Sequence, residues 1–320
     1  MVVGTRTNRA TEDIYEWKMA FGRHETFHLR DGWLTKGLVA VERDPSAFLK
    51  PGCHHELGIG INMAKSIRYW LEACGLCEPM AVTLPGKNRP AQGLKLSSLG
   101  RLILDSDPYF ESPSSSWLVH VNLANSSDLA PAWYWTFNLS DTTDFTSDQL
   151  ESGVFDFAES YATNVPTESS VRKDVRCLIR TYLQVEGTDR LSSADDPLGS
   201  PLSSLGLVTK ARSSDRHRLV FGHHPSLPIE VFMYVMYEFA GGEQVLNFDS
   251  ARWRIGSPGR LLCLDSDEIR SLIARAQLRY GTGVISEVQT AGLDNIHLDQ
   301  DASAVGFVSD YFAGLRSGGG

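Results

Sequence analysis

Two segments of the chain carry apolar residues at a helical period, and both follow the same spacing. In the first, apolar residues stand at i, i+4, i+7, i+8 and i+11, which places them on one face of a helix expected over Asn62–Ala73. This apolar stripe consists of Met63, Ile67, Trp70, Leu71 and Cys74. The opposite face holds Lys65, Arg68, Tyr69 and Glu72. Gly75 stands where helices commonly end.

The segments around this helix predict a small domain. A longer helix is expected over Leu34–Phe48 and a very short one over His55–Ile59. Behind the third helix, Ala81–Leu84 and Gly93–Leu104 flank a turn and indicate a hairpin. Three helices followed by a hairpin is the order of a winged helix, in which the last helix enters the major groove of DNA.

The second segment repeats the stripe 108 residues later, from Val171 to Tyr182. Ser169 or Ser170 is a natural N-cap for this helix. Its opposite face carries Arg172, Lys173, Arg176 and Arg180. The pentapeptide Leu-Ser-Ser-Leu-Gly also recurs, at 96–100 and 202–206. The two similar offsets predict an internal duplication, and a chance match of common residue types is the alternative.

The remaining patterns complete the expected architecture. Helices are expected over 145–161, Ile229–Phe239 and Ser266–Leu278, the last with Asp265 as its N-cap. The fold class is therefore mainly α with short β-hairpins. We expect a winged-helix-like domain over residues 1–130, a second such unit over 131–225 and a C-terminal α/β portion over 226–320.

Composition restricts how such a protein can contact DNA. The chain has 320 residues, 42% of them hydrophobic and 22% charged, which is normal for a soluble globular protein. Its net charge of −9 argues against a protein that coats DNA through electrostatics alone. Contact with duplex DNA must then come from local basic faces. The candidate DNA-binding residues are Lys65, Arg68, Tyr69, Arg172, Lys173, Arg176 and Arg180.

The sequence also bears on location. The first residues lack the apolar segment of a signal peptide, and no apolar run is long enough for a membrane helix. The five cysteines are scattered and form no disulfide framework. We therefore expect a cytoplasmic protein without a membrane partner.

The densest cluster of chemically capable side chains lies between residues 24 and 36. Cleavage of a DNA backbone needs a base or a metal ion to activate water, and charge stabilisation for the leaving oxygen. His24 or Glu25 could meet the first need, and Arg30 or Lys36 the second. The alternative is a structural network that fixes the N-terminal segment to the core.

Other chemistries find less support in the sequence. Cysteine and histidine at 53–55, with cysteines at 74 and 77, are residue types that bind zinc, but residue 74 belongs to the apolar stripe and packing explains it. No phosphate-binding glycine loop or dinucleotide fingerprint is present, so ATP chemistry is not expected. A divalent ion, Mg²⁺ or Mn²⁺, could serve DNA cleavage as a cofactor, and its ligands are not identified by the sequence.

Three stretches resemble a bacterial family built around a domain of unknown function: Phe21–Gly37, Leu57–Trp70 and Leu99–Tyr109. Genes of that family lie beside PAPS-reductase-like sulfurtransferases in DNA phosphorothioation clusters that defend against phage. The resemblance is specific over about the first 120 residues. It implies a subunit that nicks or engages DNA in concert with a cysteine desulfurase, an ATPase and the sulfurtransferase.

The resemblance leaves the activity open between three functions. A DNA nickase is favoured, a non-catalytic adaptor between DNA and the sulfurtransferase comes second, and a transcriptional regulator third. The chain could also form a homodimer. The family's catalytic residues are not transferred, so His24, Glu25, Arg30 and Lys36 are candidates on chemical grounds alone.

Overall fold

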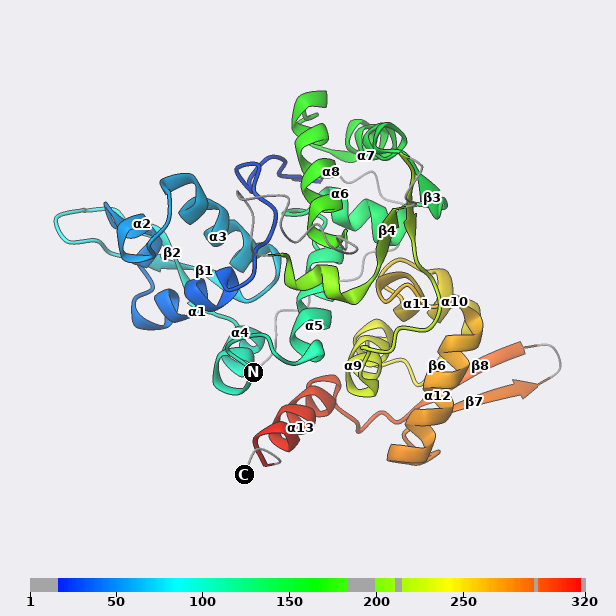
Figure 1. Ribbon diagram of the computed structural model, residues 1–320. Coiled ribbons are helices and arrows are strands. Elements are labelled where there is room, and N and C mark those ends of the chain that lie inside the picture. Colours follow the sequence, from blue (N-terminus) through cyan, green and yellow to red (C-terminus); the bar gives the residue numbers. More distant parts are fainter. Residues whose placement is uncertain (1–16, 184–198, 211–214, 291–292, 318–320) are drawn as a thin grey trace, which may run out of the picture.

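Helices hold about half of the residues that the structure describes, and three small antiparallel sheets lie among them (Figure 1). This computed structural model describes residues 17–183, 199–210, 215–290 and 293–317. The mainly α fold class with short β elements is confirmed. In the part of the chain that the structure describes, no helix has the length and apolar character needed to cross a membrane.

The N-terminal region has the expected order of elements. It contains α1 (Trp33–Arg43), the 3-10 helix η1 (Ala47–Leu49), α2 (Cys53–Glu56), α3 (Ile61–Ala73), β1 (Cys77–Val82) and β2 (Ala91–Leu96). Strands β1 and β2 form the predicted hairpin, with Cys77 opposite Leu96 and Val82 opposite Ala91. The apolar stripe of α3 faces inward, and Trp70 has no exposed surface.

Three local predictions in this region are wrong. The helix expected over Leu34–Phe48 is broken after Arg43, where Asp44 adopts an extended backbone. The strand expected over Gly93–Leu104 ends at Leu96, because Ser97 caps the helix α4 (Ser98–Ser106) by accepting a hydrogen bond from the backbone of Gly100. Tyr69, assigned to the outer face of α3, is only 7% exposed.

The middle of the chain packs two long helices against short ones. In order it contains α5 (Pro113–Ala124), α6 (Pro131–Tyr134), the π-helix η2 (Trp135–Leu139), β3 (Asp144–Phe145), α7 (Ser147–Tyr161), α8 (Glu168–Tyr182), the 3-10 helix η4 (Pro201–Leu205), β4 (Val208–Lys210) and β5 (His217–Leu219). The stripe of α8 is buried as predicted. Its N-cap is Thr167, which accepts a hydrogen bond from Ser170, so the assignment to Ser169 or Ser170 is wrong.

The C-terminal part combines helices with a three-stranded sheet of order β6-β8-β7. Its elements are α9 (Ile229–Ala240), β6 (Val245–Asn247), α10 (Phe248–Trp253), α11 (Pro258–Leu261), α12 (Ser266–Tyr280), β7 (Ile285–Thr290), β8 (Leu293–Leu298) and α13 (Ala304–Ser317). Asp265 caps α12 as predicted, by accepting from the backbone of Glu268.

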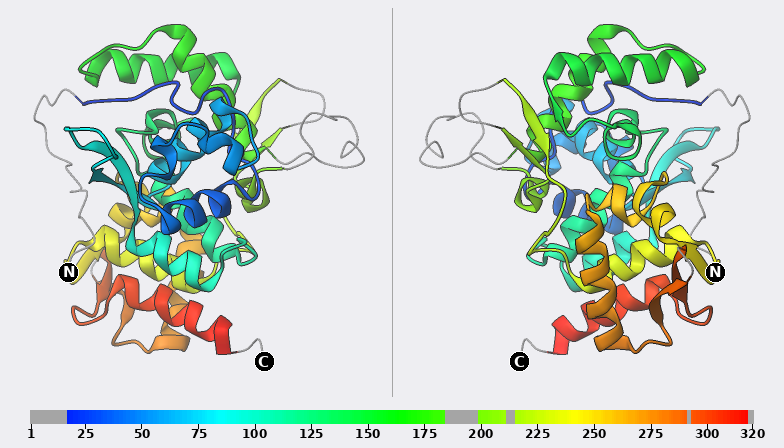
Figure 2. Two further views of the ribbon diagram at one scale, coloured as in Figure 1. Left: turned by 90° about the vertical axis from the view of Figure 1, so that its left-hand side faces the viewer. Right: turned by 90° about the vertical axis from the view of Figure 1, so that its right-hand side faces the viewer.

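One continuous core connects all these parts, from Leu29 to Phe312. Helix α13 returns to pack on α9 and α4, and it lies at the opposite end of the molecule from α7 and α8 (Figure 2). The hydroxyl groups of Ser112 and Tyr311 lie 3.0 Å apart and join the segment before α5 to α13. The domain limits at residues 130 and 225 stay a prediction.

Candidate functional site

The segment that holds His24 and Glu25 is a strained turn. Glu25 and Thr26 have φ angles of 52° and 68°, in the left-handed region that residues with a side chain seldom adopt. Each such residue costs on the order of 1 kcal/mol or more and persists only where its surroundings hold it. Backbone hydrogen bonds run from Phe27 to the carbonyl of His24 (2.9 Å) and from Glu25 to that of Gly22 (3.4 Å).

A buried carboxylate on α8 holds this turn in place. The Nε2 atom of His24 lies 2.9 Å from Oδ1 of Asp174, and the two residues are 0% and 1% exposed. The backbone N–H of Gly22 donates to the same oxygen at 2.7 Å. Burial raises the pKa of Asp174, and the hydrogen bonds from His24 and Gly22 oppose that rise. His24 therefore lies behind the turn and anchors it from inside the core.

Aromatic side chains surround this anchor. The rings of Tyr69 and Trp133 meet the His24 ring edge to face, with centroids 6.0 and 6.4 Å away. The Tyr69 hydroxyl donates to the carbonyl of Leu129 at 3.1 Å, and burial raises its pKa well above the usual value. The turn is thus fixed by α3, α6 and α8 together.

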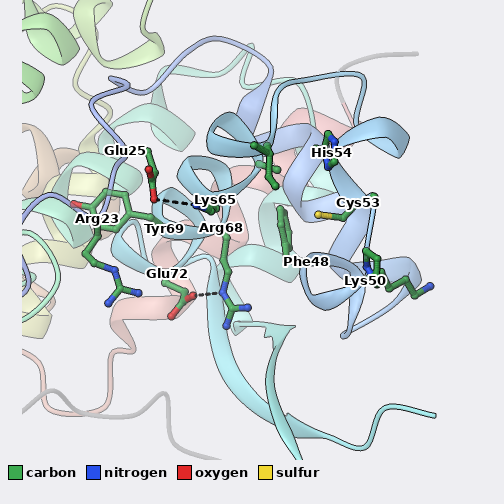
Figure 3. A pocket seen from close by; sticks show the side chains of 14 residues that line it. Arg23, Glu25, Phe48, Lys50, Cys53, His54, Lys65, Arg68, Tyr69 and Glu72 are labelled. Atoms are coloured by element: carbon green, nitrogen blue, oxygen red, sulfur yellow. Dashed lines mark hydrogen bonds and ion pairs between the residues drawn. The ribbon is translucent and has the colours of Figure 1, made fainter. Parts of the chain in front are cut away.

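Glu25 lies on the open side of the turn, at a cleft of about 360 Å³ between the turn, η1, α2 and α3 (Figure 3). We call it the first cleft. Its charged lining consists of four cations and two carboxylates: Arg23, Lys50, Lys65, Arg68, Glu25 and Glu72. The excess of cations favours an anion in the cleft, and a DNA phosphate has the chemistry to fill it.

Both carboxylates of the first cleft have a cation beside them. Lys65 Nζ lies 3.7 Å from Glu25 Oε1, and Arg68 Nε lies 3.1 Å from Glu72 Oε1. Arg68 also donates to the carbonyl of Gln92 in β2 at 2.7 Å. Arg23 has no ion-pair partner among the residues that the structure describes, and its side chain is exposed. This leaves its full charge available to a ligand.

The other catalytic candidates lie elsewhere. The guanidinium carbon of Arg30 is 5.6 Å from the ring centre of Phe27 and 5.5 Å from that of Trp33. Lys36 is exposed on α1 and lines a neighbouring cleft. The structure therefore brings Glu25 to the first cleft and places His24, Arg30 and Lys36 outside it.

The predicted basic face of α8 is exposed. All four of its cations, Arg172, Lys173, Arg176 and Arg180, reach the surface. Arg172 Nε forms an ion pair with Glu151 Oε2 at 3.0 Å. At 100° per residue, Arg172 and Arg176 stand about 200° around the helix from Asp174. One side of α8 holds the strained turn, and the opposite side presents these cations.

No group of three or more possible metal ligands occurs among the described residues. Cys53 and His54 line the first cleft without a third ligand. Burial raises the pKa of Cys77 to about 12, and Cys74 has no exposed surface. Burial keeps both thiols protonated, and the packing of Cys74 is what the apolar stripe indicates.

Sequence reasoning missed three residues of this site: Arg23, Lys50 and Asp174. Arg23 directly precedes His24 and could have been included with it. Asp174 is the one acidic residue within the apolar stripe of α8, where a carboxylate must have a buried partner. Lys50 is separated from α3 in the sequence, and no local pattern indicated that the two would line the same cleft.

The family model described as "Protein of unknown function (DUF4007)" matches residues 21–312. The chain belongs to this family. The matched span of this DUF4007 protein contains the strained turn, the first cleft and α8. No curated protein matches its sequence.

Two solved structures resemble this DUF4007 protein over most of its length. The magnesium ion-bound SspB crystal structure superimposes with a TM-score of 0.83 and 26% sequence identity, covering 93% of this chain and 89% of that chain. An SspB crystal structure gives a TM-score of 0.82 and 27% identity over the same shares. The resemblance inferred from the sequence motifs is confirmed.

Proposed function

We propose that this protein is the DNA-nicking component of a bacterial DNA phosphorothioation system, and that the first cleft is its nicking site. One observation carries the proposal: the strained turn presents Glu25 to a cleft lined by four cations. The similarity to SspB supports the assignment to such a system.

The cleft offers the two functions that hydrolysis of a phosphodiester needs. Arg23, Lys50 and Arg68 hold the phosphate and stabilise the charge that develops on it. Glu25 accepts a proton from the attacking water, whose oxygen bonds to phosphorus while the bond to the sugar oxygen breaks. The leaving sugar oxygen takes a proton from solvent. Lys65 Nζ lies 3.7 Å from Glu25 Oε1, so this ion pair helps to hold the carboxylate at the cleft.

A resident magnesium ion fits the described residues poorly. Mg²⁺ in phosphate-handling sites is held by one or two carboxylates together with substrate phosphates and water. The cleft offers Glu25 and Glu72, and each carboxylate is already next to a cation. The proposed mechanism therefore takes no step through a metal, and Mg²⁺ and Mn²⁺ enter as conditions to be varied.

Both predicted DNA-binding faces belong to this proposal. Within a winged-helix-like unit, α3 presents Lys65 and Arg68 while the β1–β2 hairpin acts as the wing. The bond from Arg68 to Gln92 ties the helix to that hairpin. Tyr69 is largely buried and serves as a wall of the cleft. The cations of α8 would give a second contact to duplex DNA from the unit over residues 131–225.

The proposed partners follow from the system. They are duplex DNA, a cysteine desulfurase, an ATPase and a PAPS-reductase-like sulfurtransferase. The last three would supply activated sulfur after a nick has opened the backbone. Cytoplasmic location and a homodimer are part of the same proposal.

A non-catalytic adaptor is the second candidate function. The observation that favours it is that each carboxylate of the first cleft lies beside a cation. This arrangement is as compatible with phosphate binding as with cleavage. A transcriptional regulator would use the same cations but would need side chains that contact base edges.

A plasmid assay separates these functions. Purified protein is incubated with supercoiled plasmid, with Mg²⁺, with Mn²⁺ and with a chelator. A nickase converts the plasmid to open circles. An adaptor retards the plasmid in a gel and leaves it supercoiled, and that result would replace the nickase with the second candidate.

A further inference from the structure

A second, larger cleft adjoins the first. It has a volume of about 600 Å³ and lies along α1, η1 and α2. The two clefts share Phe48, Lys50 and Cys53 as lining residues, so they meet along one wall. Figure 3 shows Phe48 and Cys53 on this side of the first cleft, across from Arg68. A ligand bound in the first cleft would reach the second by passing over these shared side chains.

The second cleft combines an apolar surface with cations. Its apolar lining consists of Val39, Ala40, Ala47, Phe48 and Leu57. Its cations are Lys36, Arg43 and Lys50. Lys36 and Arg43 are exposed, and neither has an ion-pair partner in the described ranges.

The carboxylates of this cleft pair with neither Lys36 nor Arg43 in the described ranges. Asp44 is occupied by Lys50 at 2.5 Å and by the backbone and hydroxyl of Ser46, each at 2.7 Å. These bonds lower the pKa of Asp44 to about 2, with the Lys50 interaction as the largest cause. Glu56 is exposed at the end of α2. Lys36 and Arg43 are left to attract an anion.

An unpaired nucleotide fits this combination better than duplex DNA. A duplex keeps its bases stacked inside and presents phosphates to a protein surface, so an apolar recess would gain nothing from it. An unpaired strand offers base faces, which stack on aromatic side chains, and phosphates, which follow cations. Phe48 supplies the aromatic ring at the junction of the two clefts.

We infer that the two clefts form one track for an unpaired DNA strand. A phosphate lies in the first cleft, and the neighbouring base lies in the second against Phe48, with Lys36 and Arg43 on the following phosphates. This inference rests on the proposed function to the extent that the first cleft binds DNA. It adds that the strand is unpaired where the protein holds it.

The test measures binding of a fluorescent single-stranded oligonucleotide, and of the duplex with the same sequence, by anisotropy across a range of salt. Phe48→Leu keeps an apolar side chain and removes the ring, so affinity for the single strand falls roughly 5-fold or more. Its affinity for the duplex stays unchanged. The double variant Lys36→Gln/Arg43→Gln lowers the salt dependence for the single strand by about 0.7 in slope for each phosphate that is no longer neutralised.

Arg275→Gln is the matched control, because Arg275 is an exposed cation on α12, and α12 lies on the other side of the molecule from α1, α2 and α3 (Figure 1). It should bind like the wild type. Thermal unfolding shows whether Phe48→Leu still folds, and if it does not, the outcome is decided by the Lys36/Arg43 variant, whose side chains are exposed.

Two results would overturn the inference. One is single-strand binding by both variants that equals the wild type. The other is an equal loss of affinity for the single strand and for the duplex, which would show that the second cleft contacts phosphates in either form of DNA. Neither depends on whether the wild type nicks plasmid DNA, so failure of the nickase proposal is seen separately.

Discussion

His24 and Asp174 stand 150 residues apart and are joined by one buried hydrogen bond of 2.9 Å. The bond ties the turn that presents Glu25 to the inner side of α8, whose outer side carries Arg172, Arg176 and Arg180. Helix α8 therefore carries one of the surfaces that the proposed function assigns to DNA and anchors the turn that brings Glu25 to the other. A change at this bond should affect both of them.

The substitution Asp174→Ala should destabilise the protein by about 3–5 kcal/mol, because it leaves the buried N–H groups of His24 and Gly22 without an acceptor. Urea unfolding measures this change. Asp141→Ala is the matched control, since Asp141 is 91% exposed and its pair with Arg260 should contribute at most about 1 kcal/mol. Equal losses in the two variants would show that the buried bond is not the anchor of the turn.

Thr26→Gly should stabilise the protein by about 1 kcal/mol, because glycine adopts a positive φ without the strain of a branched side chain. The same change gives the turn more freedom and should lower any activity that depends on the position of Glu25. Urea unfolding and the plasmid assay check the two effects. A loss of stability in this variant would mean that Thr26 is held by contacts and not under strain.

Acid should weaken the fold through His120. Its Nε2 lies 2.7 Å from the carbonyl oxygen of Leu261, and its Nδ1 lies 2.7 Å from the hydroxyl of Tyr182. A carbonyl only accepts, so Nε2 carries the proton and Nδ1 accepts from Tyr182. Burial lowers the pKa of His120 from 6.5 to about 3.

The unfolded chain therefore binds more protons than the folded one below pH 6.5, and stability falls as the pH drops from about 6.5 towards 3. Between pH 7 and pH 5 this group alone should remove about 2 kcal/mol. His120→Gln keeps a donor and an acceptor without titrating, so its unfolding free energy should change less over that interval. Identical losses in both proteins would contradict the assignment.

The substitutions Arg176→Gln and Arg180→Gln should flatten the dependence of log affinity on log salt for duplex DNA, by roughly 0.9 for each phosphate that is no longer neutralised. No ion pair to either side chain occurs among the described residues, so the changes break no internal pair. Arg275→Gln again serves as the control. An unchanged affinity and slope would make the face of α8 an ordinary solvated surface.

Much of the helical structure could be predicted, because apolar residues at a helical spacing mark the face of a helix that packs against the core. The stripe ending at Cys74 and the stripe ending at Tyr182 both face the core as expected. Tyr69 was misplaced because the pattern of one helix does not show what packs on its flank, and here the His24 ring and the carbonyl of Leu129 cover it.

The repeated pentapeptide shows where local sequence falls short. At 96–100 it ends β2 and begins α4, and a Cβ on Gly100 would lie 2.0 Å from the carbonyl oxygen of Leu76. At 202–206 it forms η4, which ends at Gly206 with a φ of 69°. The first glycine permits close packing and the second a left-handed backbone. The two copies therefore do not repeat one structure, and this match gives no support to a duplication.

The candidate site could be predicted only in part. The sequence marked the His24–Glu25 pair as important, and the structure separates their roles, with one residue buried and the other at a cleft. That separation depends on Asp174, which no local pattern connects to residue 24.

Glu25 is the residue at the first cleft to which the proposed function assigns cleavage. Glu25→Gln keeps the size of the side chain and removes its charge, and the most direct measurement is the rate at which this variant converts supercoiled plasmid to open circles, beside wild type and Arg275→Gln. We expect a loss of about 100-fold or more in this rate, with thermal stability and duplex affinity near those of the wild type. Nicking by Glu25→Gln at the wild-type rate would contradict it.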